Sequence, residues 1–173
     1  MNDAICYSYC DTPIGRLLLT AQGGALTAIY FARHQEGLPK AEWRRDNVAL
    51  AGAAEELQTY FAGERTTFDV PMDLQGTPFE RRVWNELLNI PFGVTVSYRD
   101  VAERIGQPKA CRAVGLANGR NPVPIIVPCH RVIGSNGSLT GYGGGLEIKE
   151  RLLALEGIEL PKRGRKKQAA QLF

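Results

Sequence analysis

The chain has no run of eighteen apolar residues, which is about the length that a membrane-spanning helix needs. Its first six residues lack a basic start followed by an apolar stretch, so the sequence predicts no secretion signal. Together these absences predict a cytoplasmic protein. The hydrophobic share of 44% and the charged share of 23% are ordinary for a globular protein. A length of 173 residues allows one good core or two small ones.

Cysteine and histidine are both scarce, with four cysteines and two histidines. No two cysteines form a C-x-x-C pair, and four scattered cysteines do not indicate a disulfide scaffold in a reducing compartment. Cys6, Cys10 and His34 could contribute to a zinc site, but no fourth ligand is apparent. The favoured interpretation is two cysteines in or beside a strand and one histidine in a loop.

The net charge of +3 gives little indication of a nucleic-acid partner, because basic residues are concentrated in the C-terminal tail. Residues 161–173 hold five lysines and arginines and no acidic residue, which leaves the rest of the chain near −2. This composition predicts a disordered tail with weak attraction for phosphates. Residues 98–120 are more informative, since they hold five basic side chains against two acidic ones.

The first third of the chain alternates short apolar segments with turns, which predicts an antiparallel meander. The expected strands are residues 6–9, 16–20 and 26–31, followed by a helix over 48–61 and a further strand over 66–71.

The remainder is predicted to be mostly helical, with helices over 77–89, 98–105, 107–118 and 146–156. Capping boxes at Thr77–Glu80 and Ser97–Asp100 mark the first two of these helices. The helices over 98–105 and 107–118 resemble a helix-turn-helix, because a tight glycine-containing turn joins them. The second is rich in small side chains, which let a helix lie close to DNA or, alternatively, to a neighbouring helix of the same protein.

Cys129 and His130 stand side by side after an apolar run, residues 124–127, that is predicted to be a buried strand. A thiol is mostly protonated at neutral pH, so a nucleophilic cysteine needs a base or a positive neighbour, and His130 is the candidate. A carboxylate could orient its ring. The candidate carboxylates are those of Glu147, Glu150, Glu156 and Glu159. The alternative is that the pair only packs in the core.

Glycine-rich segments at 134–137 and 141–145 follow the pair. Such loops let backbone groups close on a planar ligand, although flexible connections have the same composition. The helix-turn-helix pattern lies immediately upstream, so a candidate nucleophile and a candidate groove-binding element are joined.

Residues 121–132 strongly resemble the active-site signature of the methylated-DNA–protein-cysteine methyltransferases, the O6-methylguanine-DNA alkyltransferases. The agreement covers about residues 77 to 158. It includes the motifs at 77–81, 91–93, 97–98, 108–114, 141–145, 149–150 and 156–157. The N-terminal strands fit the smaller ribonuclease-H-like domain of the family much less specifically.

The resemblance implies an α+β protein with three parts. Residues 1–75 would form a small ribonuclease-H-like domain with an antiparallel sheet. Residues 76–160 would form a mostly helical DNA-binding and alkyl-acceptor domain with a helix-turn-helix, and residues 161–173 the basic, disordered tail. The zinc site of some family members is not matched, because a second histidine is missing from the N-terminal part.

The resemblance also implies a DNA repair protein that flips O6-methylguanine, and O4-methylthymine, out of duplex DNA. It would transfer the alkyl group irreversibly and once per molecule to its own cysteine. The implied partner is double-stranded DNA that contains O6-alkylguanine, with no membrane, no metal and no cofactor, and the free protein is expected to be monomeric.

Site residues follow from the resemblance as well. Cys129 would accept the alkyl group, His130 would be its base through a water, and Glu156 would orient His130. Asn121 would brace the active-site turn, and Tyr98 would hydrogen-bond the flipped base. DNA binding is assigned to Arg112, which would fill the gap left by the base, and to Ala110, Ala113, Lys109 and Arg120. The alkylguanine pocket is assigned to Tyr98, Val132, Tyr142, Gly143 and Lys149.

Two other functions remain open at this level. A thiol hydrolase would share Cys129, His130 and Glu156, but it would need an oxyanion hole and would turn over. A non-catalytic protein that binds alkylated DNA would have the same scaffold without a reactive thiol.

Overall fold

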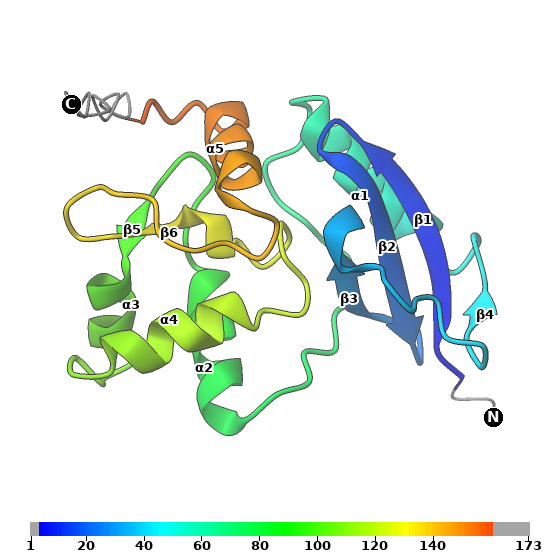
Figure 1. Cartoon of the computed structure of the whole chain (residues 1–173), viewed down its shortest axis with the longest axis horizontal. Coiled ribbons are helices and arrows are strands. Elements are labelled where there is room, and N and C mark those ends of the chain that lie inside the picture. The colour runs from blue at the N-terminus through cyan, green and yellow to red at the C-terminus, as the bar shows by residue number, and fades with distance from the viewer. Residues whose placement is uncertain (1–3, 161–173) are drawn as a thin grey trace, which may run out of the picture.

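The computed structural model describes residues 4–160, and Figure 1 shows them as two adjoining parts. A sheet with one helix forms the N-terminal part, and four helices with two very short strands form the C-terminal part. The chain is therefore α+β, as predicted. The basic tail expected at 161–173 lies outside the described residues.

The N-terminal sheet has the strand order β3-β2-β1-β4. The first three strands are β1 (Cys6–Thr12), β2 (Gly15–Gln22) and β3 (Ala25–Tyr30). Their pairing is antiparallel, so the predicted meander is confirmed. A fourth strand, β4 (Arg44–Arg45), pairs parallel to β1 and was not predicted, because two exposed arginines carry no strand pattern.

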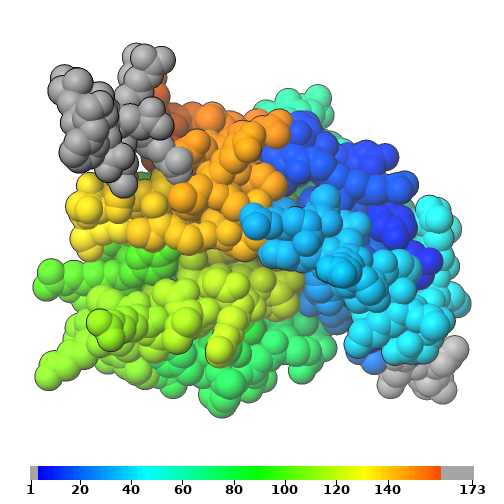
Figure 2. All heavy atoms as spheres, viewed as in Figure 1, coloured from blue at the N-terminus to red at the C-terminus, as the bar shows by residue number. Residues whose placement is uncertain are grey.

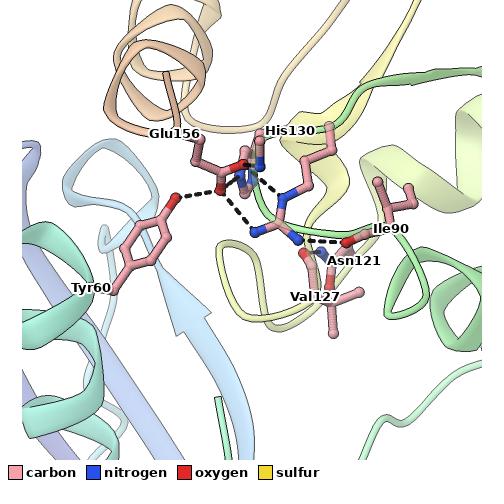
Figure 3. A network of polar contacts seen from close by, with 8 residues as sticks. Tyr60, Ile90, Asn121, Val127, His130 and Glu156 are labelled. Atoms are coloured by element: carbon pink, nitrogen blue, oxygen red, sulfur yellow. Dashed lines mark hydrogen bonds and ion pairs between the residues drawn. The ribbon is translucent and has the colours of Figure 1, made fainter. Parts of the chain in front are cut away.

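Helix α1 (Ala51–Phe61) lies against one face of this sheet (Figure 1). It begins three residues later than predicted. Ala53, Leu57 and Tyr60 form its buried face, at the spacing of one helical stripe. The large aromatic residue of this stripe, Tyr60, points away from the N-terminal part and toward the C-terminal one (Figure 3).

The strand predicted at 66–71 does not form. The Glu56 carboxylate accepts hydrogen bonds from the backbone N–H groups of Asp69 and Val70, at 2.9 and 3.3 Å. Two donors that a β-ladder would use are therefore taken by a side chain of α1. Only an isolated bridge between Leu26 and Met72 connects this segment to the sheet.

The C-terminal helices are α2 (Pro78–Leu87), α3 (Tyr98–Arg104), α4 (Cys111–Gly119) and α5 (Leu146–Leu155). Both predicted capping boxes are present. Thr77 accepts from the Glu80 N–H at 3.1 Å while the Glu80 carboxylate accepts from the Thr77 N–H at 3.0 Å. Ser97 and Asp100 make the equivalent pair, with distances of 3.0 and 2.8 Å.

Helices α3 and α4 pack on each other and are joined through a turn in which Gly106 has φ +75°. That left-handed conformation suits glycine, and it lets the chain reverse within a few residues. Helix α4 begins at Cys111 rather than at 107, because residues 107–110 continue the turn. Trp84 of α2 connects that helix to α4, because its indole N–H donates to the Ala117 carbonyl at 2.8 Å.

The apolar run at 124–127 is fully buried but is not a strand, so that prediction is wrong. Ile125 has φ +76°, and the Val127 N–H donates to the Val123 carbonyl at 3.0 Å, which makes the run a tight turn. Pro124 and Pro128 have no N–H to offer to a ladder. The chain then forms a short 3-10 helix, η2 (Cys129–Arg131), and enters β6 (Val132–Ile133), which pairs parallel to β5 (Val96–Ser97).

One continuous core joins the two parts. The edge strand β3 contacts the turn before η2, where the Ile29 N–H donates to the Pro122 carbonyl at 2.9 Å. In Figure 2 the loop before α5 (yellow and orange) lies over α4 and against the light-blue segment that follows β3. Among residues 4–160, no helix has the length and apolarity needed to cross a membrane.

Candidate active site

Cys129 opens the 3-10 helix η2 and is only 4% exposed. Asn121 holds the turn at 123–127 that precedes Cys129. The Asn121 amide donates to the Val127 carbonyl at 2.8 Å, and its oxygen accepts from the Val123 N–H at 3.0 Å. Asn118 of α4 donates to the Cys129 carbonyl at 3.3 Å. Two asparagines thus connect the cysteine to the end of the helix-turn-helix, and Asn118 was not predicted.

The surroundings of Cys129 favour the protonated thiol. Burial raises its pKa, and the nearby Asn121, Lys149 and Tyr142 side chains oppose that shift only in part. The Tyr142 hydroxyl is buried beside the thiol and has no hydrogen-bond partner of good geometry among the described residues. A thiol held neutral by burial needs a base before it can act as a nucleophile.

His130 is completely buried, and its Nε2 lies 2.7 Å from Oε1 of Glu156. Burial lowers the pKa of His130, and the Glu156 carboxylate offsets this in part. A neutral imidazole that donates from Nε2 to a carboxylate leaves Nδ1 as an acceptor. His130 Nδ1 is buried without a hydrogen-bond partner among the described residues, so an acceptor is free for a proton.

Glu156 receives five hydrogen bonds from two parts of the chain (Figure 3). Burial alone would raise its pKa, but hydrogen bonds from His130, Arg131 and Tyr60 hold it well below the usual range. The structure therefore selects Glu156 among the four candidate glutamates. Glu147 and Glu159 are exposed.

Sequence reasoning missed Arg131 and Tyr60. Arg131 donates from Nε to Oε2 of Glu156 at 2.8 Å and from Nη2 to Oε1 at 2.9 Å, and its Nη1 donates to the Ile90 carbonyl at 2.6 Å. A basic residue directly after the Cys-His pair could have indicated this ion pair. No sequence pattern points to Tyr60, which is 96 positions away from Glu156.

A pocket of about 590 Å³ opens between the helix-turn-helix and the glycine-rich loop. Its lining combines Tyr98 of α3, Arg112 and Gly115 of α4, and residues 140–143 of the loop. A smaller cavity of about 200 Å³ adjoins it, reaches Cys129 and extends to Phe31 and His34. Asn118, Gly119, Tyr142 and Gly143 line both, so the two hollows adjoin, and Cys129 lines the smaller one.

Tyr98 and the loop are held by a few contacts. The Tyr98 hydroxyl accepts from Thr140 at 3.0 Å, and burial raises the pKa of this phenol, so it stays a hydrogen-bond donor. Lys149 is fully buried and donates to the carbonyls of Val132 and Thr140, at 2.6 and 3.2 Å. Burial lowers the pKa of Lys149 to about 8.

The predicted pocket residues therefore divide into two groups. Tyr98, Tyr142 and Gly143 line the pocket, whereas Val132 and Lys149 lie behind the loop and secure it. Gly144 packs closely on the N-terminal part, because a side-chain carbon there would come within 3.2 Å of the Phe31 ring and the ring would have to shift. The N-terminal part thus contacts the loop through Phe31, whose ring centroid lies 5.7 Å from that of Tyr142.

Two of the five residues predicted to meet DNA lie on the exposed face of α4, and the other three flank the helix. Arg112 and Ala113 are exposed, and Lys109 and Ala110 precede the helix in the turn. Arg120 follows the helix and forms an ion pair with Glu80 at 3.3 Å. Leu116, three positions after Ala113, is 62% exposed and was not predicted. An apolar side chain on such a helix suits contact with sugars and base edges in a minor groove.

Cys6 and Cys10 lie in β1, as expected, where their thiols contact the carbonyls of Ala21 and Ala54, at 3.5 and 3.8 Å. His34 does not lie with these two cysteines but lines the smaller cavity that also reaches Cys129. Within residues 4–160 no three metal-binding side chains are grouped so that they could hold a metal ion.

A buried cysteine next to a histidine–glutamate pair, beside a helix-turn-helix, indicates the class: a DNA-binding protein with a candidate cysteine nucleophile. The 6-O-methylguanine DNA methyltransferase DNA-binding domain matches residues 78–158, and the ribonuclease-like domain of the same family matches residues 5–74. The chain belongs to the 6-O-methylguanine DNA methyltransferase family, as the resemblance indicated. The predicted boundary at 75/76 falls between the matched ranges and stays a prediction.

Relatives of this family span nearly the whole chain. The methylated-DNA–protein-cysteine methyltransferase of Mycobacterium tuberculosis is 52% identical over 157 residues, covering 91% of this chain and 95% of the relative. The constitutive enzyme of Bacillus subtilis is 45% identical and covers 88% and 95%. The crystal structure of Mycobacterium tuberculosis OGT in complex with DNA has 53% identity and a TM-score of 0.82, covering 87% of this chain and 92% of that one.

Proposed function

We propose that this protein repairs double-stranded DNA by moving the alkyl group of O6-alkylguanine to Cys129. The observation that carries the proposal is a buried thiol that lies next in sequence to the His130–Glu156 pair and lines a cavity adjoining the pocket walled by the helix-turn-helix. Relatives across the full length are methylated-DNA–protein-cysteine methyltransferases, and one structural neighbour is bound to DNA.

The chemistry follows from the hydrogen-bond pattern. His130 takes the thiol proton at Nδ1 through a water, and Glu156 stabilises the resulting imidazolium through Nε2. The sulfur attacks the alkyl carbon in line, an S–C bond forms and the C–O6 bond breaks. The electron pair stays on the guanine oxygen, where the Tyr98 hydroxyl supplies a hydrogen bond. The leaving guanine anion takes up one proton from water, and the His130 imidazolium releases the thiol proton to water, so the products are restored guanine and a thioether.

A thioether is a stable end point. None of the described groups around Cys129 offers a route back to the free thiol, so one molecule accepts one alkyl group. The same geometry would serve O4-methylthymine, whose alkyl carbon lies on an equivalent exocyclic oxygen.

The target carbon cannot be reached inside a duplex, so the nucleotide must leave the stack. Extrusion costs on the order of a few kcal/mol, less for a weakly paired damaged base. The exposed face of α4, with Arg112, Ala113 and Leu116, would lie in the minor groove and hold the distorted duplex. Arg112 lines the pocket mouth and can fill the gap that the base leaves.

A label experiment tests the proposal against its two rivals. The protein is mixed with duplex DNA that carries isotopically labelled O6-methylguanine, and the label is located by mass spectrometry of proteolytic peptides. We expect label on Cys129, at no more than one equivalent per protein. A thiol hydrolase would release label to solution over many turnovers, and a lesion-binding protein would leave it on the DNA.

Arg112→Ala is expected to slow transfer from duplex DNA about tenfold or more, because the extruded state loses the side chain that replaces the base. Transfer from the free base O6-benzylguanine should change less than twofold, since no extrusion is needed. Single-turnover rates on both substrates measure the effect. Arg99→Ala, which removes an exposed cation from α3, is the charge-matched control. Equal losses on both substrates would contradict the assignment.

We also place the protein in the cytoplasm and regard it as monomeric when free. A reduced acceptor thiol requires a reducing compartment, which supports the location. Fractionation of cells and light scattering of the purified protein would test these two points.

A further inference from the structure

Tyr60 is the one described residue of the N-terminal part that hydrogen-bonds the Glu156 carboxylate. It lies on α1, is completely buried, and its hydroxyl donates to Oε1 of Glu156 at 2.7 Å. Oε1 is also the atom that His130 contacts. Figure 3 shows the tyrosine reaching this oxygen from the opposite side to the histidine.

The carboxylate is crowded with donors. Its Oε1 receives Tyr60, His130 Nε2 and Arg131 Nη2, and its Oε2 receives Arg131 Nε and the Gly93 N–H. Two carboxylate oxygens offer about four lone-pair sites between them. Three donors on one oxygen therefore share its charge, and each weakens the hold of the others.

We infer that Tyr60 is a positioning residue for alkyl transfer, whose hydroxyl limits how strongly Glu156 supports His130. The effect on the transfer rate rests on the proposed function, whereas the effect on the His130 pKa does not. The N-terminal part would then set the basicity of the group that activates Cys129, although it contributes no atom to the reaction.

The charge balance gives the direction. A hydrogen bond to Oε1 draws negative charge away from the atom that must stabilise the His130 imidazolium. Removing the Tyr60 hydroxyl should make Oε1 a stronger acceptor for Nε2–H and raise the pKa of His130. Arg131 and Gly93 still hold the carboxylate in place and charged, so orientation survives the change.

Other charged and titratable groups near the His130–Glu156 pair also influence the pKa of His130. His130 is also exposed to the charges of Arg131 and Lys149, which lower its pKa. Tyr142 and Cys129 are the other titratable groups near the His130–Glu156 pair, and they lie close to each other. None of these groups changes in Tyr60→Phe. The Tyr60 ring packs against Phe61, Phe68 and Phe92 at centroid distances of 5.3 to 6.2 Å, and phenylalanine keeps that packing.

The test is a titration of His130 in wild type and Tyr60→Phe by NMR of the imidazole ring. The chain has only two histidines, so His34→Gln assigns the signals. We expect the His130 pKa to rise by about half a unit or more in Tyr60→Phe. Tyr7→Phe, which removes a hydroxyl from a half-buried residue of β1, should leave the His130 pKa unchanged.

The single-turnover rate of alkyl transfer is then measured against pH for the same variants. Protonated His130 cannot accept the thiol proton, so the acid-side inflection should move to higher pH by the same amount as the NMR value. At high pH the rates of wild type and Tyr60→Phe should agree within about twofold.

Three outcomes decide the matter. An unchanged His130 titration in a folded Tyr60→Phe protein would overturn the inference. A rate loss that is equal at every pH would also overturn it, since that indicates only a packing role. If the wild type transfers no alkyl group, the proposed function fails, but the NMR comparison still decides whether Tyr60 controls His130.

Discussion

Cys129→Ala is expected to transfer no detectable alkyl group while binding lesion-bearing duplex DNA as tightly as the wild type. The acceptor atom is missing, and no other described thiol lies beside the His130–Glu156 pair. The exposed face of α4 is unaffected, because the Cys129 side chain is buried beneath it. Labelled O6-methylguanine duplex and a gel-shift titration give the two measurements.

Cys111→Ala is the matched control. Cys111 lines the larger pocket from the start of α4 and is more exposed than Cys129, so a merely accessible thiol would be this one. Its variant should transfer alkyl groups at the wild-type rate. Label on the protein in Cys129→Ala, or loss of label in Cys111→Ala, would remove the basis of the proposed function.

The elements that the sequence predicted well are those that local chemistry determines. The capping boxes at Thr77–Glu80 and Ser97–Asp100 involve residues three positions apart, so they are visible in the sequence and present in the structure. The meander follows from short strands joined by tight turns. Helix starts were less exact, since α1 and α4 begin later than their apolar patterns suggest.

The two errors have different causes. The segment at 66–71 has the composition of a strand, but a carboxylate from α1 captures two of its backbone donors. The run at 124–127 has the hydrophobicity of a buried strand, but its flanking prolines and the turn at Ile125 exclude one. In the first segment tertiary context outweighs local propensity. In the second, the prolines visible in the sequence already argue against a strand.

The same distinction applies to the candidate site. Adjacent residues indicated the thiol and its base, whereas the choice of Glu156 depended on the family resemblance. The wider network, with Arg131 and Tyr60, became visible only once the two parts of the chain were placed together. Leu116 was not singled out in the sequence, and its exposure on α4 became visible only in the structure.

Glu156→Gln should lower both the stability and the transfer rate of the protein. The amide keeps the shape of the side chain but leaves the buried Arg131 guanidinium without a counter-charge, and breaking a buried pair in this way costs about 3–5 kcal/mol. The His130 imidazolium also loses its partner, so transfer should slow on the order of 100-fold. Urea unfolding and single-turnover kinetics measure the two effects, with the exposed Glu159→Gln as control.

The pH dependence of this variant gives a second test. Because the folded pKa of Glu156 lies below its unfolded value of about 4.3, its carboxylate stabilises the wild type above that pH and loses this contribution as the pH falls further. His130 also has a lowered folded pKa, so the unfolded chain binds a proton first and stability already falls below about pH 6.5.

In Glu156→Gln the free energy of unfolding should therefore no longer show the decrease below about pH 4.3 that Glu156 causes. The decrease that begins near about pH 6.5, caused by His130, should remain. Without the carboxylate the His130 pKa is lowered further, so the upper step should be at least as large as in the wild type. Unfolding free energies measured from pH 8 to about pH 3 separate the two steps. If the wild type and Glu156→Gln had parallel profiles, Glu156 would not be the charged partner of the buried Arg131–His130 network.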